Sequence, residues 1–290
     1  MAPSDGSQAG DTPLRLDELA DAEALVAEAG WNQIGADWRM FLDFGTVRAV
    51  HDGGRVIATA ATLPYGARFG WISMVLVAAS HQRRGLATKL LRRCIDDLVA
   101  DGLVPVLDAT PAGREVYLAL GFQDCWDYHR LTRGAATVTA AAAAPAGITI
   151  RPLATEHWPS LCAYDATAFG ADRGFLLARL RGRLRPAELV AERDGRIAGF
   201  LLGRDGRTTS HLGPLVADDD AVAQALLTRA LGAIGGPIYL DFADAKAALR
   251  DWLAARGFSP QRKLTRMLHR RNQRFDNAAR TFAVVGPEFG

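Results

Sequence analysis

The sequence predicts an α/β protein built from two copies of one unit. Segments with the apolar spacing of amphipathic helices alternate with short apolar, β-branched runs that are typical of strands. The same order of segments occurs on both sides of an Ala-rich run at 135–144, which is followed by Pro145-Ala146-Gly147. The predicted domains are therefore residues 13–133 and 148–290, joined by a linker over 134–147.

Glycine and proline signals bound the segments of the first half. Gly30, Gly45 and Gly102 end apolar helical stripes, and Pro111 suits the first turn of a helix. In chain order we expect helices over 16–29 and 37–44, strands over 47–50, 55–62 and 71–77, a helix over 84–100, a strand over 104–108, a helix over 111–120 and a last strand pair after Gly121-Phe122.

The second half repeats this order with one shorter connection. Residues 114–122 resemble residues 250–258. The offset between the copies falls from 139 at Val77 and Val216 to 136 at Gly121 and Gly257, so the second copy is three residues shorter between these anchors. We expect the loss in the loop after the strand, where the first copy has a basic loop at 81–85 and the second has Asp218-Asp219-Asp220.

Composition and charge exclude several classes of protein. A chain that is 49% hydrophobic and 23% charged is typical of globular proteins and not of disordered ones. Lys and Arg number 34 against 32 Asp and Glu, which does not favour nucleic acid or an anionic membrane as a partner. Basic residues do gather in the second half, where we expect a solvated face. They are Arg179, Arg181, Arg183, Arg185, Arg262, Lys263, Arg266, Arg270, Arg271 and Arg274.

The sequence predicts a cytoplasmic protein without a bound metal. Residues 1–11 lack the basic and apolar regions of a signal peptide, and the Ala-rich run is too short for a membrane span of about 20 residues. Cys94, Cys125 and Cys162 are odd in number and far apart, which fits a reducing compartment. The histidines do not have the spacing of a metal site.

A strand, a short basic loop and a helix follow one another at 71–88. Gly85 lets the backbone approach a ligand closely, and free N–H groups at a helix start attract anions. Arg83 and Arg84 add donors for a phosphate group. The alternative is an ordinary connection with solvated arginines. Neither GxxxxGK[ST] nor GxGxxG occurs here, which argues against a P-loop kinase and a nicotinamide dehydrogenase.

The residues Gln82-x-x-Gly85-x-Ala87 resemble the [RQ]xxGx[GA] signature of the GNAT superfamily of N-acetyltransferases. An apolar strand that ends at Val77 precedes them, and Tyr117-x-x-x-Gly121-Phe122 resembles the YxxxGF helix of the family. The second half resembles the same fold in degenerate form. The resemblance implies two tandem GNAT-like domains, each a mixed, mostly antiparallel splayed sheet flanked by helices.

The resemblance also implies acetyl-CoA as co-substrate. Acetyl-CoA would lie between two splayed parallel strands, with its pantetheine on the backbone of Val75, Leu76 and Val77. Its acetyl group would pass directly to a primary amine, with a strand N–H at the oxyanion. The loop for the pyrophosphate would consist of Gln82, Arg83, Arg84, Gly85, Leu86, Ala87 and Thr88.

Tyr117 and Asp108 are the predicted catalytic residues. Tyr117 matches the general acid of the family, and the alternative is a core aromatic on an amphipathic helix. Many family members carry a Glu on the strand at 71–77, which this chain lacks, so the base stays open. Asp108 ends an apolar strand beside the cleft and suits a base or an amine anchor, or else a cap for the helix at Pro111, aided by Thr110.

The predicted acceptor pocket contains Trp31, Asn32, Asp37 and Trp38, and Gln33 lies in the same segment, in the region that usually lines this pocket in the superfamily. Two indoles, two amides and a carboxylate suit a cationic or aromatic amine, although the indoles also suit simple packing on the sheet. The acceptor would be a small molecule or a peptide amine, and the sequence leaves a homodimer open.

The second half lacks the residues that carry these expectations. Leu253 stands in the place of Tyr117, and the three successive carboxylates would repel a pyrophosphate. We expect residues 148–290 to be a non-catalytic scaffold or one wall of the acceptor pocket. A non-catalytic acyl-CoA-binding or interaction protein is the alternative function for the whole chain.

Overall fold

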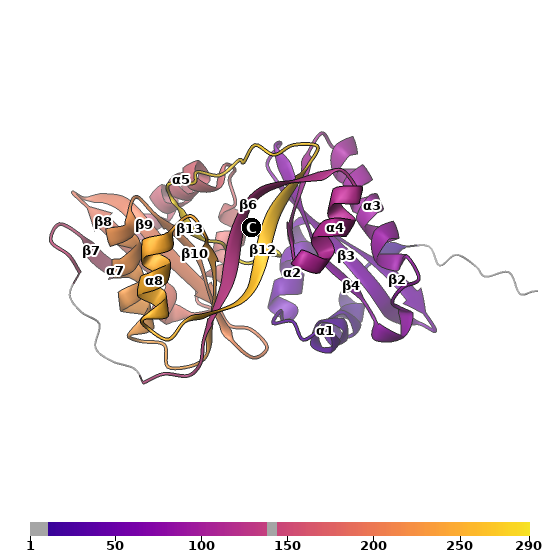
Figure 1. Cartoon of the computed structure of the whole chain (residues 1–290), viewed down its shortest axis with the longest axis horizontal. Coiled ribbons are helices and arrows are strands. Elements are labelled where there is room, and N and C mark those ends of the chain that lie inside the picture. The colour runs from indigo at the N-terminus through magenta and orange to yellow at the C-terminus, as the bar shows by residue number, and fades with distance from the viewer. Residues whose placement is uncertain (1–10, 138–143) are drawn as a thin grey trace, which may run out of the picture.

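The chain folds around one long sheet in a computed structural model that describes residues 11–137 and 144–290; residues 138–143 of the predicted linker lie outside the described part. The described residues form a 13-stranded sheet in the order β1-β2-β3-β4-β5-β12-β6-β11-β13-β10-β9-β8-β7, with helices on both faces (Figure 1). Most neighbours are antiparallel, while β4–β5 and β10–β11 are parallel. The predicted α/β fold with a mixed, mostly antiparallel sheet is confirmed.

The first half contains six strands and four α-helices among the described residues. The strands are β1 (Thr12–Pro13), β2 (Thr46–Asp52), β3 (Arg55–Tyr65), β4 (Phe69–Val77), β5 (Val104–Ala109) and β6 (Phe122–Arg133). The helices are α1 (Leu19–Glu28), α2 (Gly35–Phe44), α3 (Leu86–Ala100) and α4 (Pro111–Ala119), with short 3-10 turns η1 (Leu16–Glu18) and η2 (Ala79–His81).

The second half repeats this order and adds one strand. Its strands are β7 (Thr149–Pro152), β8 (Leu189–Arg193), β9 (Arg196–Arg204), β10 (Ser210–Ala217), β11 (Ile238–Ala243), β12 (Ser259–His269) and β13 (Thr281–Ala283). Its helices are α5 (Trp158–Phe169), α6 (Gly174–Leu180), α7 (Asp220–Leu231) and α8 (Ala247–Ala254), with 3-10 turns η3 (Thr155–His157) and η4 (Arg185–Ala187). None of the described helices is both long and apolar enough to span a membrane.

Helices cover both faces of the sheet because its strands are apolar on both sides. In β3, Ala61 and Leu63 belong to the core that α1 and α2 cover, while Ala58 and Ala60 belong to the core under α3. Successive side chains of a strand point to opposite faces, so a continuous apolar run such as β3 buries both.

The two halves exchange their last strands at the centre of the sheet (Figure 1). β12 of the second half lies between β5 and β6 of the first half, and β6 pairs in turn with β11 of the second half. The predicted last strand pair within the first half is therefore wrong, because β6 is a single strand. The repeat boundaries predicted from the sequence are not boundaries of separate units in space.

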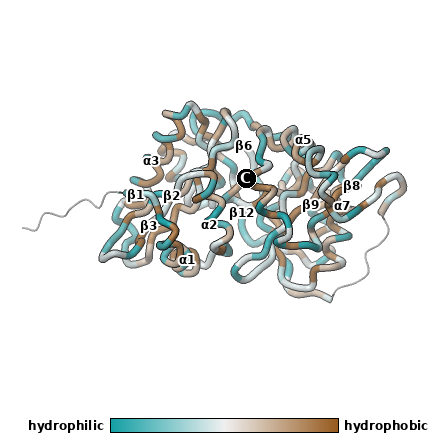
Figure 2. Tube along the Cα trace, turned by 180° about the vertical axis from the view of Figure 1, so that it is seen from behind, coloured by the Kyte–Doolittle hydropathy of each residue, from teal (hydrophilic) through white to brown (hydrophobic). Residues whose placement is uncertain are grey.

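The C-terminal segment serves both halves. β13 lies between β10 and β11 and is antiparallel to both. The chain then crosses to the first half, where Tyr65 Oη donates to the Phe289 carbonyl at 2.6 Å and Trp71 Nε1 donates to the Pro287 carbonyl at 2.9 Å. Seen from behind, the end marked C accordingly lies in the middle of the molecule (Figure 2).

Candidate functional site

A gap opens between the parallel strands β4 and β5. The two strands pair from Phe69 to Trp71 and then diverge. On its other side β4 has a register irregularity against β3, and Met74 there has a φ of 51°, a conformation that is rare for a residue with a side chain. The strand backbone beyond Trp71 is consequently unpaired on the side that faces β5.

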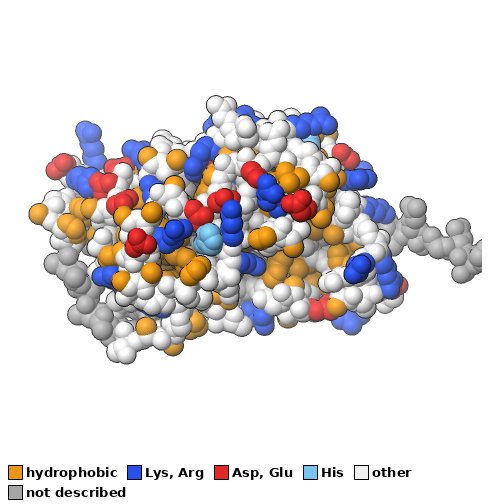
Figure 3. All heavy atoms as spheres, viewed as in Figure 1, with side chains coloured by type: hydrophobic (Ala, Val, Ile, Leu, Met, Phe, Trp, Pro, Cys, Tyr) orange, Lys and Arg blue, Asp and Glu red, His pale blue; other side chains and the backbone are white. Residues whose placement is uncertain are grey.

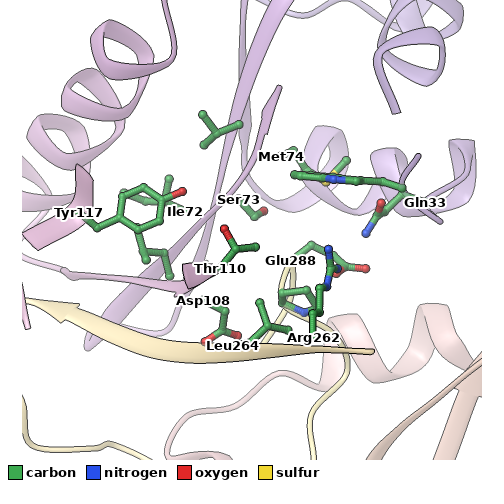
Figure 4. A pocket seen from close by; sticks show the side chains of 14 residues that line it. Gln33, Ile72, Ser73, Met74, Asp108, Thr110, Tyr117, Arg262, Leu264 and Glu288 are labelled. Atoms are coloured by element: carbon green, nitrogen blue, oxygen red, sulfur yellow. The ribbon is translucent and has the colours of Figure 1, made fainter. Parts of the chain in front are cut away.

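A cavity of about 250 Å³ occupies this gap. One end is lined by Ile72, Ser73, Thr110 and Tyr117 of the first half. Figure 4 shows Gln33, Arg262 and Glu288 at the other end, and the last two come from the second half. The cavity wall is therefore built jointly by β4, β5, α4, the exchanged strand β12 and the C-terminal segment.

Four buried polar atoms around the cavity lack a hydrogen-bond partner. They are Gln33 Oε1, Ser73 Oγ, Arg262 Nε and Glu288 Oε2. Most buried polar atoms in proteins are hydrogen-bonded, because burying an unpaired one costs about 1–3 kcal/mol. Such a concentration of unpaired atoms around one cavity is typical of a site that binds a polar ligand.

Tyr117 points into the cavity from α4 (Figure 4). Its ring packs edge-on against Phe122, with the ring centroids 6.1 Å apart. Burial raises the pKa of Tyr117, so the phenol stays protonated near neutral pH. The ring of Tyr117 therefore packs in the core, as one interpretation of the sequence expects. Its hydroxyl also reaches the cavity, as a general acid must.

Asp108 lies at the floor of the cavity in an ion pair. Arg266 lies opposite it on β12, and its Nε and Nη2 donate to the two carboxylate oxygens at 2.9 and 3.0 Å. Burial raises the pKa of Asp108, and Arg266 opposes this shift. The N-cap of α4 is Thr110, whose Oγ1 accepts from the Gly113 N–H at 3.2 Å, so Asp108 is not the cap. Both oxygens of Asp108 face Arg266, which leaves little basicity for a substrate.

Glu288 presents the other carboxylate of the cavity. Its Oε1 pairs with the buried guanidinium of Arg204, whereas its Oε2 has no partner. Asp37 holds the other side of Arg204, at 2.9 Å, and is itself held by Arg183 at 2.7 Å. Burial acts to raise the pKa of Glu288, but Arg204 and its neighbours lower it below the usual value. Glu288 is therefore ionised. The Gln33 side chain also interacts with this carboxylate and helps to lower its pKa, while Oε2 has no partner at hydrogen-bond geometry.

The start of α3 lies in an exposed loop that continues from β4. Gly85 is the N-cap of α3 with a φ of 78°, and no side chain caps the helix. Among the described residues, the backbone N–H groups of Leu86, Ala87 and Thr88 have no acceptor. Arg83 and Arg84 are exposed beside them. These groups form a positively polarised surface that suits an anion.

The predicted acceptor residues occupy different places. Trp31 lines the cavity. Asn32 instead joins the two halves, because its amide donates to the Thr209 carbonyl at 2.7 Å and accepts from the Thr208 and Thr209 N–H groups. Asp37 faces Arg204, and Trp38 is fully buried in the core. The packing alternative describes Trp38, while Asp37 reaches the cavity only through Arg204 and Glu288.

The corresponding gap of the second half is filled. β10 and β11 pair from Ser210 to Leu212 and then diverge, and β13 occupies the space between them. The start of α7 is capped, since Asp219 Oδ1 accepts from the Val222 N–H at 3.0 Å. Leu253 is fully buried in the core of this half.

Most of the basic residues that gather in the second half are in ion pairs. Their partners include Asp43 for Arg179, Glu188 for Arg181 and Asp127 for Lys263. On the face shown in Figure 3, acidic and basic side chains are interspersed. Within the described residues no group of three or more His, Cys, Asp and Glu side chains is arranged to hold a metal ion.

Glu288 and Arg262 were not among the site residues predicted from the sequence. Both lie in the second half, far from the loop and helix that carry the motif. Two residues separate Glu288 from the apolar run that ends at Val285, and Arg262 is one of many arginines. Neither residue therefore belongs to a local sequence pattern that predicts a site. Gln33, which the sequence places with Trp31 and Asn32 in the acceptor region, does line the cavity.

Comparisons with known proteins follow the two halves. The model of the "Acetyltransferase (GNAT) family" matches residues 17–122, and the model of the "Acetyltransferase (GNAT) domain" matches residues 161–283. The uncharacterised N-acetyltransferase YitH of Bacillus subtilis is 23% identical over 255 residues, which cover 84% of this chain and 86% of YitH. An uncharacterised N-acetyltransferase of Streptomyces avermitilis is 28% identical over 254 residues, which cover 76% of this chain and 61% of that protein.

Solved structures share the fold over the whole chain. One is the crystal structure of a Pyrococcus horikoshii protein that is described as a proposed acetyltransferase. It has a TM-score of 0.77 at 18% identity, and the match covers 100% of this chain and 99% of that protein's chain. A tandem GNAT protein from the clavulanic acid biosynthesis pathway has a TM-score of 0.65 at 15% identity, with 89% of this chain and 97% of its own covered.

Proposed function

Since this chain belongs to the GNAT superfamily of N-acetyltransferases and contains two tandem GNAT domains, we propose that its first half transfers an acetyl group from acetyl-CoA directly to a primary amine. The observation that carries this proposal is the open gap between β4 and β5. The gap holds a cavity lined by unpaired polar atoms, and β4 leads from this cavity toward the uncapped start of α3.

The residues around the gap fit acetyl-CoA. The pyrophosphate would be bound by the free N–H groups at the start of α3, with Arg83 and Arg84 adding charge. The pantetheine would pair with the unpaired edge of β4 from Val75 to Val77, as an added strand pairs with a sheet. The thioester would then reach the cavity, which Val75 also lines.

Two side chains of the cavity match the proton transfers of this reaction. The amine nitrogen attacks the thioester carbon, the carbon–sulfur bond breaks, and the thiolate leaves with a proton that Tyr117 donates. A β4 N–H stabilises the oxyanion. Glu288 Oε2 accepts an N–H of the bound ammonium, and the first proton passes through Glu288 to solvent, which leaves the neutral amine that attacks. The second proton leaves the nitrogen after the attack and, by way of solvent, restores the phenol of Tyr117.

Glu288 is preferred to Asp108 for this task because only Glu288 has a free oxygen. The lowered pKa of Glu288 keeps its carboxylate ionised. An ionised carboxylate of low pKa is a good anchor for a cationic amine but only a weak base. In this proposal Asp108 positions Arg266 and closes the floor of the cavity.

The second half binds no acetyl-CoA in this proposal. β13 occupies the gap that corresponds to the cavity, and the Asp219 carboxylate occupies the N–H groups at the start of α7. The second half contributes the wall of the acceptor site instead, through β12 and the C-terminal segment.

Two measurements on the intact chain test the proposal. Calorimetry with acetyl-CoA should give one site per chain, and release of CoA should depend on an added amine and saturate with it. Acetyl-CoA binding without amine-dependent release, over a broad panel of amines, would favour the alternative of a non-catalytic acyl-CoA-binding protein. A stoichiometry of two would contradict the role given to the second half.

A further inference from the structure

Arg262 is a cation without a counter-ion at the acceptor end of the cavity. It lies on β12, is half-buried, and its guanidinium lines the cavity beside Glu288 (Figure 4). Its Nε has no hydrogen-bond partner. Among the described residues, no acidic side chain lies within ion-pair distance of it.

The other charged groups that line the cavity form ion pairs. Asp108 is paired with Arg266, and Glu288 is paired with Arg204. The nearby Arg130 is paired with Asp241 and repels Arg262. Among the described residues that line the cavity, Arg262 is therefore the charged group that forms no ion pair. Burial and Arg130 lower the pKa of Arg262, while the more distant carboxylates of Asp241 and Glu288 act to raise it, and an arginine remains charged at neutral pH.

A half-buried, unpaired charge destabilises a protein unless a ligand neutralises it. Lys263, the neighbour of Arg262, points to the other side of the sheet and has an acidic partner, Asp127, at 2.7 Å. The contrast between these two adjacent residues indicates that the charge of Arg262 faces the cavity for a ligand.

We propose that the acceptor amine also carries an anionic group, a carboxylate or a phosphate, and that Arg262 binds this group. The inference rests on the proposed function, because it assumes that the amine lies at Glu288. The ligand then places its ammonium nitrogen against Glu288 Oε2 and its acidic group against Arg262. A guanidinium binds carboxylate and phosphate oxygens with two parallel hydrogen bonds, so both anions satisfy it.

The size of the cavity favours a small acceptor of this kind. Its volume of about 250 Å³ is below the roughly 300–1,000 Å³ of typical small-molecule pockets. The acetyl thioester takes part of this space. A compact amine with an acidic group, such as an amino acid or an aminoalkyl phosphate, therefore fits better than a bulky hydrophobic amine.

Matched pairs of amines test the proposal on the full-length protein. The pairs are alanine with alaninamide, for a carboxylate, and phosphoethanolamine with ethanolamine, for a phosphate. We expect one acidic member to have a KM at least about tenfold below its neutral partner, since a hydrogen-bonded charge contact is worth that factor or more. Which pair shows the difference identifies the anion.

The variant Arg262→Met should abolish that difference and leave acetyl-CoA affinity unchanged. It should not lower the melting temperature, because it removes an unpaired charge; a structural role would predict the opposite. Arg262→Lys should restore part of the preference. Lys263→Met, which removes a neighbouring cation outside the cavity, should keep the full preference.

Equal KM values within both pairs, or a preference that survives Arg262→Met, would overturn the proposal. If no amine is acetylated, the proposed function fails separately. The anion site is then tested by thermal shift with the same amino acid and phosphate in the presence of acetyl-CoA. Stabilisation of the wild type but not of Arg262→Met would support the site, and equal shifts would reject it.

Discussion

The two halves of the chain share one fold but differ in what lies between their central parallel strands. In the first half, β4 and β5 separate after Trp71 and leave a cavity. In the second half, β10 and β11 separate after Leu212, and β13 fills the space. The same divergence thus leaves a cavity in one half and a packed sheet in the other.

The helices that follow β4 and β10 also differ, because the start of α3 is uncapped and the start of α7 is capped. The chain enters α3 through residues 78–85 and ends at a glycine cap, so the first N–H groups stay free. It enters α7 through Asp218 and Asp219 alone, and Asp219 caps the helix with its own carboxylate. A built-in anion in the second half occupies the place that an external anion is expected to occupy in the first.

This comparison teaches that residues of the chain itself can fill one of two duplicated gaps. The segment that fills the second gap continues into the first half and places Glu288 at the cavity. The packing of one gap and the wall of the other therefore depend on the same stretch of chain.

The largest expected effect follows from the exchange of β6 and β12. Residues 1–147 and 148–290, expressed as separate chains, should each fail to fold. Each lacks a central strand and leaves one partner of the pairs Arg266–Asp108 and Arg130–Asp241 without its counter-charge. Breaking one buried pair costs about 3–5 kcal/mol, a large part of a total stability of about 5–15 kcal/mol.

Circular dichroism and analytical gel filtration would measure folding of the two fragments. Co-expression of both should restore a folded complex and serves as the control. A monomeric, folded first half that binds acetyl-CoA would show that the exchanged strand is dispensable.

Gly85→Glu should weaken acetyl-CoA binding by at least about a hundredfold. A carboxylate near a pyrophosphate is repelled by several kcal/mol at an effective dielectric constant of about 20. Calorimetry measures the affinity. Gly195→Glu is a matched control, because Gly195 also has a positive φ, of 72°, and open space around it, but lies in a turn of the second half.

Both variants should lose about 1–2 kcal/mol of stability from the left-handed conformation. Only Gly85→Glu should lose affinity. An equal loss in both would mean that backbone strain, and not the charge at the start of α3, controls binding.

Tyr117→Phe should lower kcat by about a hundredfold with little change in acetyl-CoA affinity, the low end of the range for general acid catalysis. The buried hydroxyl is the proton donor for the thiolate in the proposed reaction. Tyr164→Phe offers a control in the second half. It removes hydroxyl contacts to Ala198 and Asp218 at 2.9 Å, and it should cost about 1 kcal/mol of stability without changing kcat.

Glu288→Gln should raise the KM for the amine about tenfold and leave acetyl-CoA affinity unchanged, since the amide has no negative charge for the ammonium group. A kinetic titration with the best amine measures this. An unchanged KM would contradict the role of Glu288 as the anchor of the amine.

The same variant has a predicted effect on the pH dependence of stability. The pKa of Glu288 is lower in the folded protein than its usual value of about 4.3. Its ionised form therefore stabilises the wild type above that pH, and this stability is lost as the pH falls through the folded pKa. Melting temperatures between neutral and acidic pH should fall less steeply for Glu288→Gln than for the wild type.

Local patterns predicted the elements well where local energetics decide them. The predicted helix ending before Gly30 is observed as η1 and α1, and the strand at 71–77 is observed as β4 with two more residues. Apolar periodicity, glycine stops and prolines act within a few residues, so they can be read from the chain. The loop around Gly85 is of this kind, because a helix start and a glycine cap are local features.

Long-range pairing was not visible in the same way. The register that sets Arg266 opposite Asp108 joins residues on exchanged strands, and the predicted last strand pair failed for that reason. The predicted acceptor residues were chosen by proximity in sequence. Of these, Trp31 and Gln33 line the cavity, while Asn32 is held by Thr208 and Thr209 of the other half.

The sequence by itself determined the duplicated α/β architecture, the loop and uncapped helix start at 82–88 and the position of Tyr117 on its helix, because each follows from contacts between residues that are close in the chain. Only the tertiary structure decided that β13 closes the second gap and that Glu288 and Arg262 complete the first cavity. The physical reason is that the role of a buried carboxylate or guanidinium depends on whether an oppositely charged or hydrogen-bonding side chain lies against it. That partner is fixed by packing between strands far apart in sequence and not by any local pattern.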